Sequence, residues 1–110
     1  MCIKASTDRL WLLEVICSSW RGPVVVAVFV PHREAMLQEP LAAPPSCGNR
    51  VSLHEHTAAL GEDANEYPVN GLRNEALALV ETSHFLASDI DFIPSTGLYD
   101  EVRIIIFLRL

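Results

Sequence analysis

The first third of the chain contains one helix-like and one strand-like pattern of apolar residues. The helix-like positions recur every three or four residues, at Leu10, Leu13, Cys17 and Trp20. This spacing predicts an amphipathic helix that is capped by Thr7 or Asp8 and runs to about Ser18. Residues 24–30 are an unbroken apolar run, mostly β-branched, which is typical of a strand covered on both faces of a parallel sheet.

The middle of the chain is less regular. A short helix is expected over residues 32–38, and residues 39–50 are rich in proline, alanine, serine and glycine, which predicts an irregular loop. Residues 51–55 alternate between apolar and polar side chains, so they predict a short strand. Residues 61–66 are polar and predict a second loop.

The second half returns to helix and strand. Good helix formers with one apolar side predict a helix over residues 72–81, which the chain enters through Tyr67 and Pro68. Residues 85–91 predict a buried strand that ends in two carboxylates. A turn follows, and then a helix from Leu98 to Arg103; residues 104–110 support no assignment.

Strands that alternate with helices indicate an α/β fold with a mainly parallel sheet and flanking helices. A length of 110 residues suits one small domain. In such sheets ligands bind beyond the carboxyl ends of the strands, and Asp89 and Asp91 lie at such an end.

Composition and charge narrow the function. The chain is 50% apolar and 20% charged, which is typical of a globular protein, and its net charge of −6 argues against nucleic-acid binding. Between Glu55 and Glu101 the only basic residue is Arg73, so this stretch repels phosphate unless a cation is bound. No signal peptide or membrane span is expected, because charges interrupt the N-terminus and no apolar run approaches the roughly 20 residues that cross a bilayer. As written, the chain is expected to be cytoplasmic.

Cysteines and histidines offer weaker candidates. Cys2, Cys17 and Cys47 form neither a metal-binding spacing nor an even disulfide framework, and Cys17 is predicted to be a small core residue. His54 and His56 could share one face of a strand, but we interpret them as surface histidines.

Asp89 and Asp91 are the main candidates for chemistry. They are separated by one residue, so where the strand frays into a turn their carboxylates can converge on one ion. Their oxygens suit Mg²⁺ or Mn²⁺, which can bridge the oxygens of a diphosphate and stabilise charge on a departing nucleoside diphosphate. The alternative is that both carboxylates merely end a strand and are solvated.

A longer pattern surrounds this acidic pair. Residues 67–76 read YPVNGLRNEA, and residues 85–95 read FLASDIDFIPS. Together they resemble the Tyr-Pro-x-Asn-x-Leu-Arg-Asn-x-Ala and Asp-x-Asp-Phe-x-Pro segments of the glycosyltransferase family that includes LARGE-type glucuronyltransferases (glycosyltransferase family 49). The resemblance covers about residues 8–31, with the first helix and strand, and residues 51–103, the nucleotide-sugar and metal half. It is absent from residues 104–110.

The resemblance implies a partial GT-A (Rossmann-like) fold, in which Asp89 and Asp91 bind Mn²⁺ (or Mg²⁺) and the diphosphate of a UDP-sugar. Asn70, Arg73 and Asn74 match the family's helix beside that site, and their spacing places them on one helix face. Arg73 could bind phosphate or could instead form an ion pair with one of the carboxylates. Asn70 and Asn74 could contact the nucleotide-sugar or could cap or pack the helix.

The function implied is transfer of a glucuronosyl or hexosyl group from a UDP-sugar to a glycan or glycoprotein acceptor in the Golgi lumen. The chain is expected to be a single partial domain, because a complete family domain is about twice as long or more. A truncated and inactive enzyme is therefore expected. A non-catalytic nucleotide-sugar-binding protein and an unstable fragment are the alternatives. Loss of half the domain is expected to leave residues 24–30 partly exposed.

Overall fold

The computed structural model describes residues 1–30, 41–57 and 68–109. Its strands are β1 (Cys2–Ser6), β2 (Val24–Val30), β3 (Val51–Thr57) and β4 (Ala87–Asp89). Its helices are α1 (Leu12–Ser19), α3 (Val69–Ala78) and α4 (Leu98–Arg109), with short 3₁₀ helices at Thr7–Arg9 and Pro45–Cys47. The helix expected over residues 32–38, the loop expected over residues 61–66 and Tyr67 lie outside the described residues.

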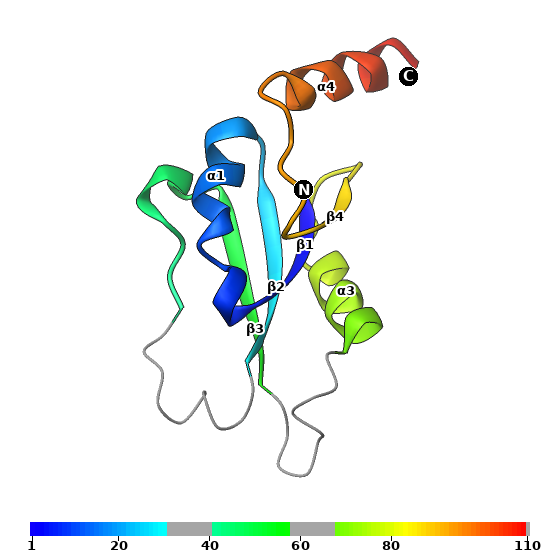
Figure 1. The fold of residues 1–110 in the computed structure, drawn as a ribbon. Coiled ribbons are helices and arrows are strands. Elements are labelled where there is room, and N and C mark those ends of the chain that lie inside the picture. The colour runs from blue at the N-terminus through cyan, green and yellow to red at the C-terminus, as the bar shows by residue number, and fades with distance from the viewer. Residues whose placement is uncertain (31–40, 58–67, 110) are drawn as a thin grey trace.

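The described strands form one parallel sheet in the order β3-β2-β1-β4 (Figure 1). The chain moves outward from β1 to β2 and β3, and then returns to place β4 on the other side of β1. The strand order therefore reverses between β1 and β4, and α/β sheets bind ligands at the carboxyl ends of the strands beside such a reversal. The predicted α/β fold with a parallel sheet is confirmed.

Helices cover both faces of this sheet. Successive strand residues point to opposite faces, so Ile3 and Ala5 of β1 join the core beneath α1, whereas Cys2 packs with Leu72 and Ala76 of α3. The expectation that residues 24–30 would be partly exposed was wrong: in β2 only Val25 is not fully buried. The reason is that β2 lies between two strands, with α1 above it and α3 below it.

Two strands differ from their predictions. β1 was not predicted, because Lys4 and Ser6 interrupt its apolar pattern. β4 is confined to three residues, and it is a partly exposed edge strand rather than a buried one. Phe85, which was expected to begin this strand, is 53% exposed. Ile90, which directly follows β4, is buried.

The helices begin and end near their predicted positions. α1 starts at Leu12 after a 3₁₀ turn, without a side-chain cap from Thr7 or Asp8. α3 begins directly after Pro68 but ends three residues short of the predicted residue 81. None of the described helices is long and apolar enough to span a bilayer.

α4 accounts for most of the segment that the sequence left unassigned, because it continues through Arg109. Its first turn is anchored by Tyr99, whose ring lies edge-on to Trp20 at a centroid distance of 4.9 Å. Beyond that turn the helix extends away from the sheet (Figure 1), and Leu108 is 75% exposed.

A disulfide joins Cys17 of α1 to Cys47 of the second 3₁₀ helix. The sequence showed no even disulfide framework and did not predict this pair; Cys17 is buried in the core as expected. The guanidinium of Arg50 adds to this link by donating to the carbonyls of Cys17 (3.0 Å) and Trp20 (2.5 Å). Cys47 and Arg50 consequently attach this part of the chain to the carboxyl-terminal end of α1.

Candidate functional site

A cleft of about 460 Å³ lies where β1, β4 and α3 meet. Its charged lining residues are Lys4, Arg73 and Asp89, and the ring of Phe92 also lines it. It therefore occupies the strand-order reversal at which a sheet of this topology is expected to bind ligands.

Asp89 faces Lys4 in this cleft. The two residues are paired neighbours on β4 and β1, and Lys4 Nζ lies 2.7 Å from Asp89 Oδ1. The hydrogen bond from Lys4 lowers the pKa of Asp89; partial burial opposes this effect, and the charges of Lys4 and Arg73 add to it. Asp89 is thus held in its ionised form.

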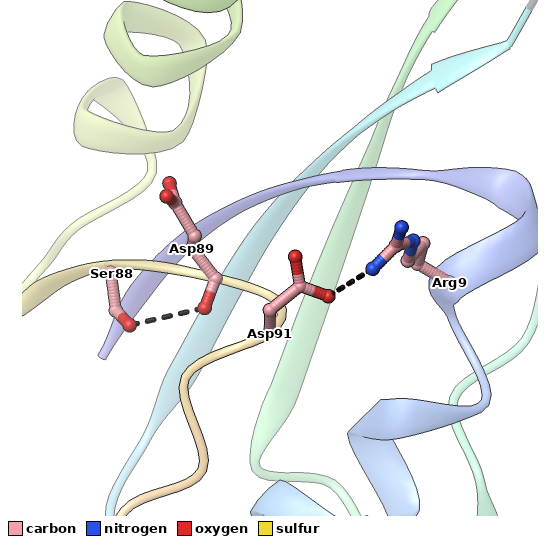
Figure 2. Close-up of polar contacts among 4 residues, drawn as sticks. All are labelled: Arg9, Ser88, Asp89 and Asp91. Carbon is pink, nitrogen blue, oxygen red and sulfur yellow. Dashed lines mark hydrogen bonds and ion pairs between the residues drawn. The ribbon is translucent and has the colours of Figure 1, made fainter.

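Asp91 has a different partner. It forms an ion pair with Arg9, which follows β1 in the 3₁₀ helix Thr7–Arg9. Figure 2 shows the Asp91 carboxylate turned toward Arg9, whereas the Asp89 side chain extends in another direction. The two carboxylates are close in sequence, but in this structure each is neutralised by a separate cation.

The three predicted residues of α3 are placed differently from one another. Arg73 lines the cleft, whereas Asn70 and Asn74 are exposed and do not line it. The ion pairs proposed for Arg73 are made by Lys4 and Arg9 instead. Neither asparagine caps α3, because its N-cap residue, Pro68, has no side-chain cap hydrogen bond.

Lys4 and Arg9 were missed in the sequence analysis. Lys4 is the middle residue of β1, a strand that was not predicted, and Arg9 lies in the 3₁₀ helix that follows it. The available signal was a single lysine within a short, largely apolar segment that precedes the first helix. Had residues 2–6 been recognised as a strand beside β4, both cations would have been candidates.

The fit of a divalent ion depends on Asp89 and Asp91. Across the described ranges, no three His, Cys, Asp or Glu side chains form a ready-made group of metal ligands. The two carboxylates are well exposed (63% and 61%), and each ion pair engages Oδ1. They fit Mg²⁺ or Mn²⁺, which retain water or phosphate oxygens as further ligands, but not a closed structural site. A shared ion requires both side chains to turn away from Lys4 and Arg9.

The histidine pair lies on the α3 face of β3. His56 Nδ1 is 2.7 Å from Glu75 Oε1, and His54 Nε2 is 3.7 Å from Glu75 Oε2. The interpretation as surface histidines suits His54, which is 47% exposed. His56 instead connects β3 to α3, the helix that carries Arg73.

Comparisons with known proteins agree with the resemblance in the sequence. A family model described as "Glycosyl-transferase for dystroglycan" matches residues 37–107. Human xylosyl- and glucuronyltransferase LARGE1 is 37% identical over 103 residues, which are 91% of this chain and 13% of LARGE1. Rat xylosyl- and glucuronyltransferase LARGE2 is 39% identical over 101 residues, which are 91% of this chain and 14% of LARGE2.

A third relative, chicken LARGE2s, is 39% identical over 103 residues, or 91% of this chain and 13% of that protein. The chain thus spans about an eighth of the length of these relatives. The family model nevertheless covers well over half of the chain, including α3, the acidic pair and the part of the cleft that α3 and β4 form. The chain therefore belongs to the family of glycosyltransferases for dystroglycan.

Proposed function

We propose that the cleft between β1, β4 and α3 binds the diphosphate of a UDP-sugar together with Mn²⁺ (or Mg²⁺), and that Asp89 and Asp91 hold this ion. The supporting observation is the position of the acidic pair at the carboxyl end of β4, directly beside the strand-order reversal. The bound ion would stabilise the negative charge that develops on a departing nucleoside diphosphate.

The charges around the cleft favour a phosphate ligand. From the sequence, the stretch between Glu55 and Glu101 is acidic, and Arg73 is its only lysine or arginine. In the folded chain Lys4, which comes from the first strand, lines the same cleft as Arg73. Two cations therefore lie beside the single carboxylate of Asp89, and the planar guanidinium of Arg73 can offer paired donors to phosphate oxygens.

The reaction class follows from the relatives, which are xylosyl- and glucuronyltransferases. We propose transfer of a glucuronosyl or other glycosyl group to a glycan or glycoprotein acceptor. Because the chain spans 13–14% of those proteins, the acceptor and the turnover are part of this proposal, and no catalytic base is assigned.

The disulfide is evidence about the cellular compartment in which the protein acts. Disulfides persist in oxidising compartments and are rare in the cytosol. The Cys17–Cys47 bond therefore supports a site of action in the lumen of the secretory pathway, such as the Golgi, rather than the cytoplasmic location expected from the absence of a signal.

Calorimetric titration of the chain with UDP, with and without Mn²⁺, tests the site. We expect binding that depends on Mn²⁺ and that is lost in Asp89→Ala and Asp91→Ala. Asp100→Ala is the matched control, because Asp100 is also an ion-paired aspartate but forms its pair with Arg21 rather than with a cation near the cleft. Unchanged Mn²⁺-dependent binding in both cleft variants would overturn the assignment.

Turnover is tested separately from binding. Release of UDP from UDP-xylose or UDP-glucuronic acid in the presence of glycan acceptors would support the transferase. Tight, Mn²⁺-dependent UDP binding without any release would support the alternative of a non-catalytic nucleotide-sugar-binding protein.

A further inference from the structure

We propose that the chain associates with copies of itself through α4: the outer face of α4 of one copy enters an apolar groove beside α4 of the next copy. The groove lies at the amino-terminal ends of β1, β2 and β4, because Met1, Pro23 and Leu86, which directly precede these strands, line it. The acidic pair lies beyond the other end of β4, so this inference does not depend on the proposed function.

The groove can hold apolar side chains from a helix. Its volume is about 470 Å³, which lies in the range of roughly 300–1,000 Å³ that is typical of binding pockets. Trp20, Leu86 and the half-exposed ring of Phe85 line one side of it. The other side is a single face of α4, since its lining residues have helical spacing: Tyr99, Val102, Arg103 and Ile106.

The outer face of α4 consists of Glu101, Ile104, Ile105 and Leu108. These residues repeat the spacing of the groove-lining residues two positions later, which is a rotation of about 200° around the helix. The three apolar side chains are 58%, 53% and 75% exposed, on a part of α4 that extends away from the sheet (Figure 1). A helix with apolar residues on opposite faces is normally buried on both, so the outer face requires a partner surface.

The charges of the two surfaces favour a second copy as that partner. The outer face carries one acid, Glu101, and the α4 wall of the groove carries one base, Arg103. Neither residue takes part in the ion pairs formed within the described ranges; the Arg103 guanidinium lies 5.4 Å from the centroid of the Tyr99 ring. An apolar surface with one acid thus matches an apolar groove with one base. An anionic membrane surface would instead repel Glu101.

The contact is head to tail. The outer face and the groove lie on opposite sides of α4, so they cannot meet within one chain, whereas the outer face of one copy can enter the groove of another. A contact between two different surfaces leaves one of each free at the ends of the assembly, so further copies can add. We therefore expect association that grows with concentration and does not stop at a dimer.

Sedimentation velocity of the full chain over a wide range of concentration tests this contact, with circular dichroism to verify folding. Leu108→Asp alters the outer face, and Phe85→Asp alters the groove. Each should weaken association by about tenfold or more, because each places a charge in an apolar contact. Trp11→Asp is the matched control: it changes a residue of equal character, 68% exposed, that lies just before α1, and it should leave association unchanged.

Mixing the two variants distinguishes a head-to-tail contact from a symmetric one. The Leu108→Asp chain retains an intact groove, and the Phe85→Asp chain retains an intact outer face. In equal amounts they should form a one-to-one pair that grows no further, although each variant alone stays monomeric.

A charge exchange tests the pairing of Glu101 with Arg103 without altering the apolar residues. Glu101→Arg and Arg103→Glu should each weaken association, because each brings like charges together, and the double variant Glu101→Arg/Arg103→Glu should recover most of it. A chain that is monomeric at every concentration, or that binds lipid vesicles without self-association, would overturn the proposal. So would association that persists in both folded aspartate variants, or a mixture of them that remains monomeric.

Discussion

Cys17 of α1 is bonded to Cys47, which lies 30 residues later in the chain, and both residues are buried. The bond ties a proline-rich segment to the helix that covers one face of the sheet. The ends of this loop also flank all of β2, the most deeply buried strand. The bond therefore limits the conformations that the unfolded chain can adopt over a segment that supplies a buried strand to the folded core.

Reduction of this disulfide should destabilise the fold strongly. A closed loop of this length corresponds to about 3–4 kcal/mol of unfolded-chain entropy. We expect the double variant Cys17→Ala/Cys47→Ala, or the unaltered chain in reductant, to lose a comparable free energy of unfolding in urea titrations. Ser46→Ala, at an exposed neighbouring position, is the control. A midpoint that does not change with reductant would contradict the bond.

Arg50 should stabilise the same region independently of the disulfide. Its guanidinium donates to the carbonyls of Cys17 and Trp20 at the end of α1. Hydrogen bonds from a charged donor usually contribute about 1.5–3 kcal/mol, so we expect Arg50→Met to lower the free energy of unfolding by about 2 kcal/mol. Arg50→Lys should recover only part of this loss, because an ammonium group cannot reproduce the planar arrangement of donors. If the free energy of unfolding were equal in Arg50→Met and Arg50→Lys, the stabilising role of the guanidinium would be contradicted.

The titration of Asp89 gives a prediction in acid. Its pKa is lowered from an ordinary value of 3.8, chiefly by the hydrogen bond from Lys4. A carboxyl whose pKa is lower in the folded state stabilises the fold fully above its unfolded-state pKa of about 4, and this contribution is lost as the pH falls through the lowered value. We expect an NMR titration of the Asp89 carboxyl carbon to have its midpoint below 3.8 and to move upward in Lys4→Gln. Asp89→Asn should weaken the dependence of stability on pH below about pH 4.

Substitution by alanine should have opposite effects on stability at two of the glycines. A Cβ on Gly22 would overlap the ring of Tyr99, with Cζ only 2.7 Å away, whereas on Gly71 the nearest atom, Cβ of Pro68, is at 3.7 Å. Gly22→Ala should displace Tyr99 from Trp20, at a cost of about 1 kcal/mol for the lost aromatic pair, and increase hydrogen exchange in α4. Gly71→Ala should stabilise α3 by about 0.5–1 kcal/mol. Unchanged exchange in α4 would show that Tyr99 does not anchor it.

The parts of the fold that were predicted correctly have strong local patterns. β2 is a run of seven apolar residues, and α3 has one apolar stripe that begins after a proline. β1 has no such pattern, and it is a strand because β2 and β4 pair with it on both sides. Pairing between segments more than 80 residues apart cannot be deduced from local periodicity, and for this reason Lys4 and Arg9 were missed.

The candidate site was predicted in part for the same reason. The positions of Asp89 and Asp91 at a strand end, and of Arg73 beside them, follow from local pattern and from the family resemblance. The separate partners of the two carboxylates depend on where β1 lies. Whether Asp89 and Asp91 hold a common metal remains a prediction. The disulfide was missed because three cysteines do not show which of them pair.

The central place of β1 has a consequence for the order in which the protein can assemble. β1 pairs with β2 on one side and with β4 on the other, and β4 is made more than 80 residues after β1. A nascent chain can join β1, β2 and β3 early, since these lie side by side in chain order. Residues 87–92, which form one wall of the cleft, are made after these three strands, so the charged residues of the cleft meet only once β4 has joined the sheet.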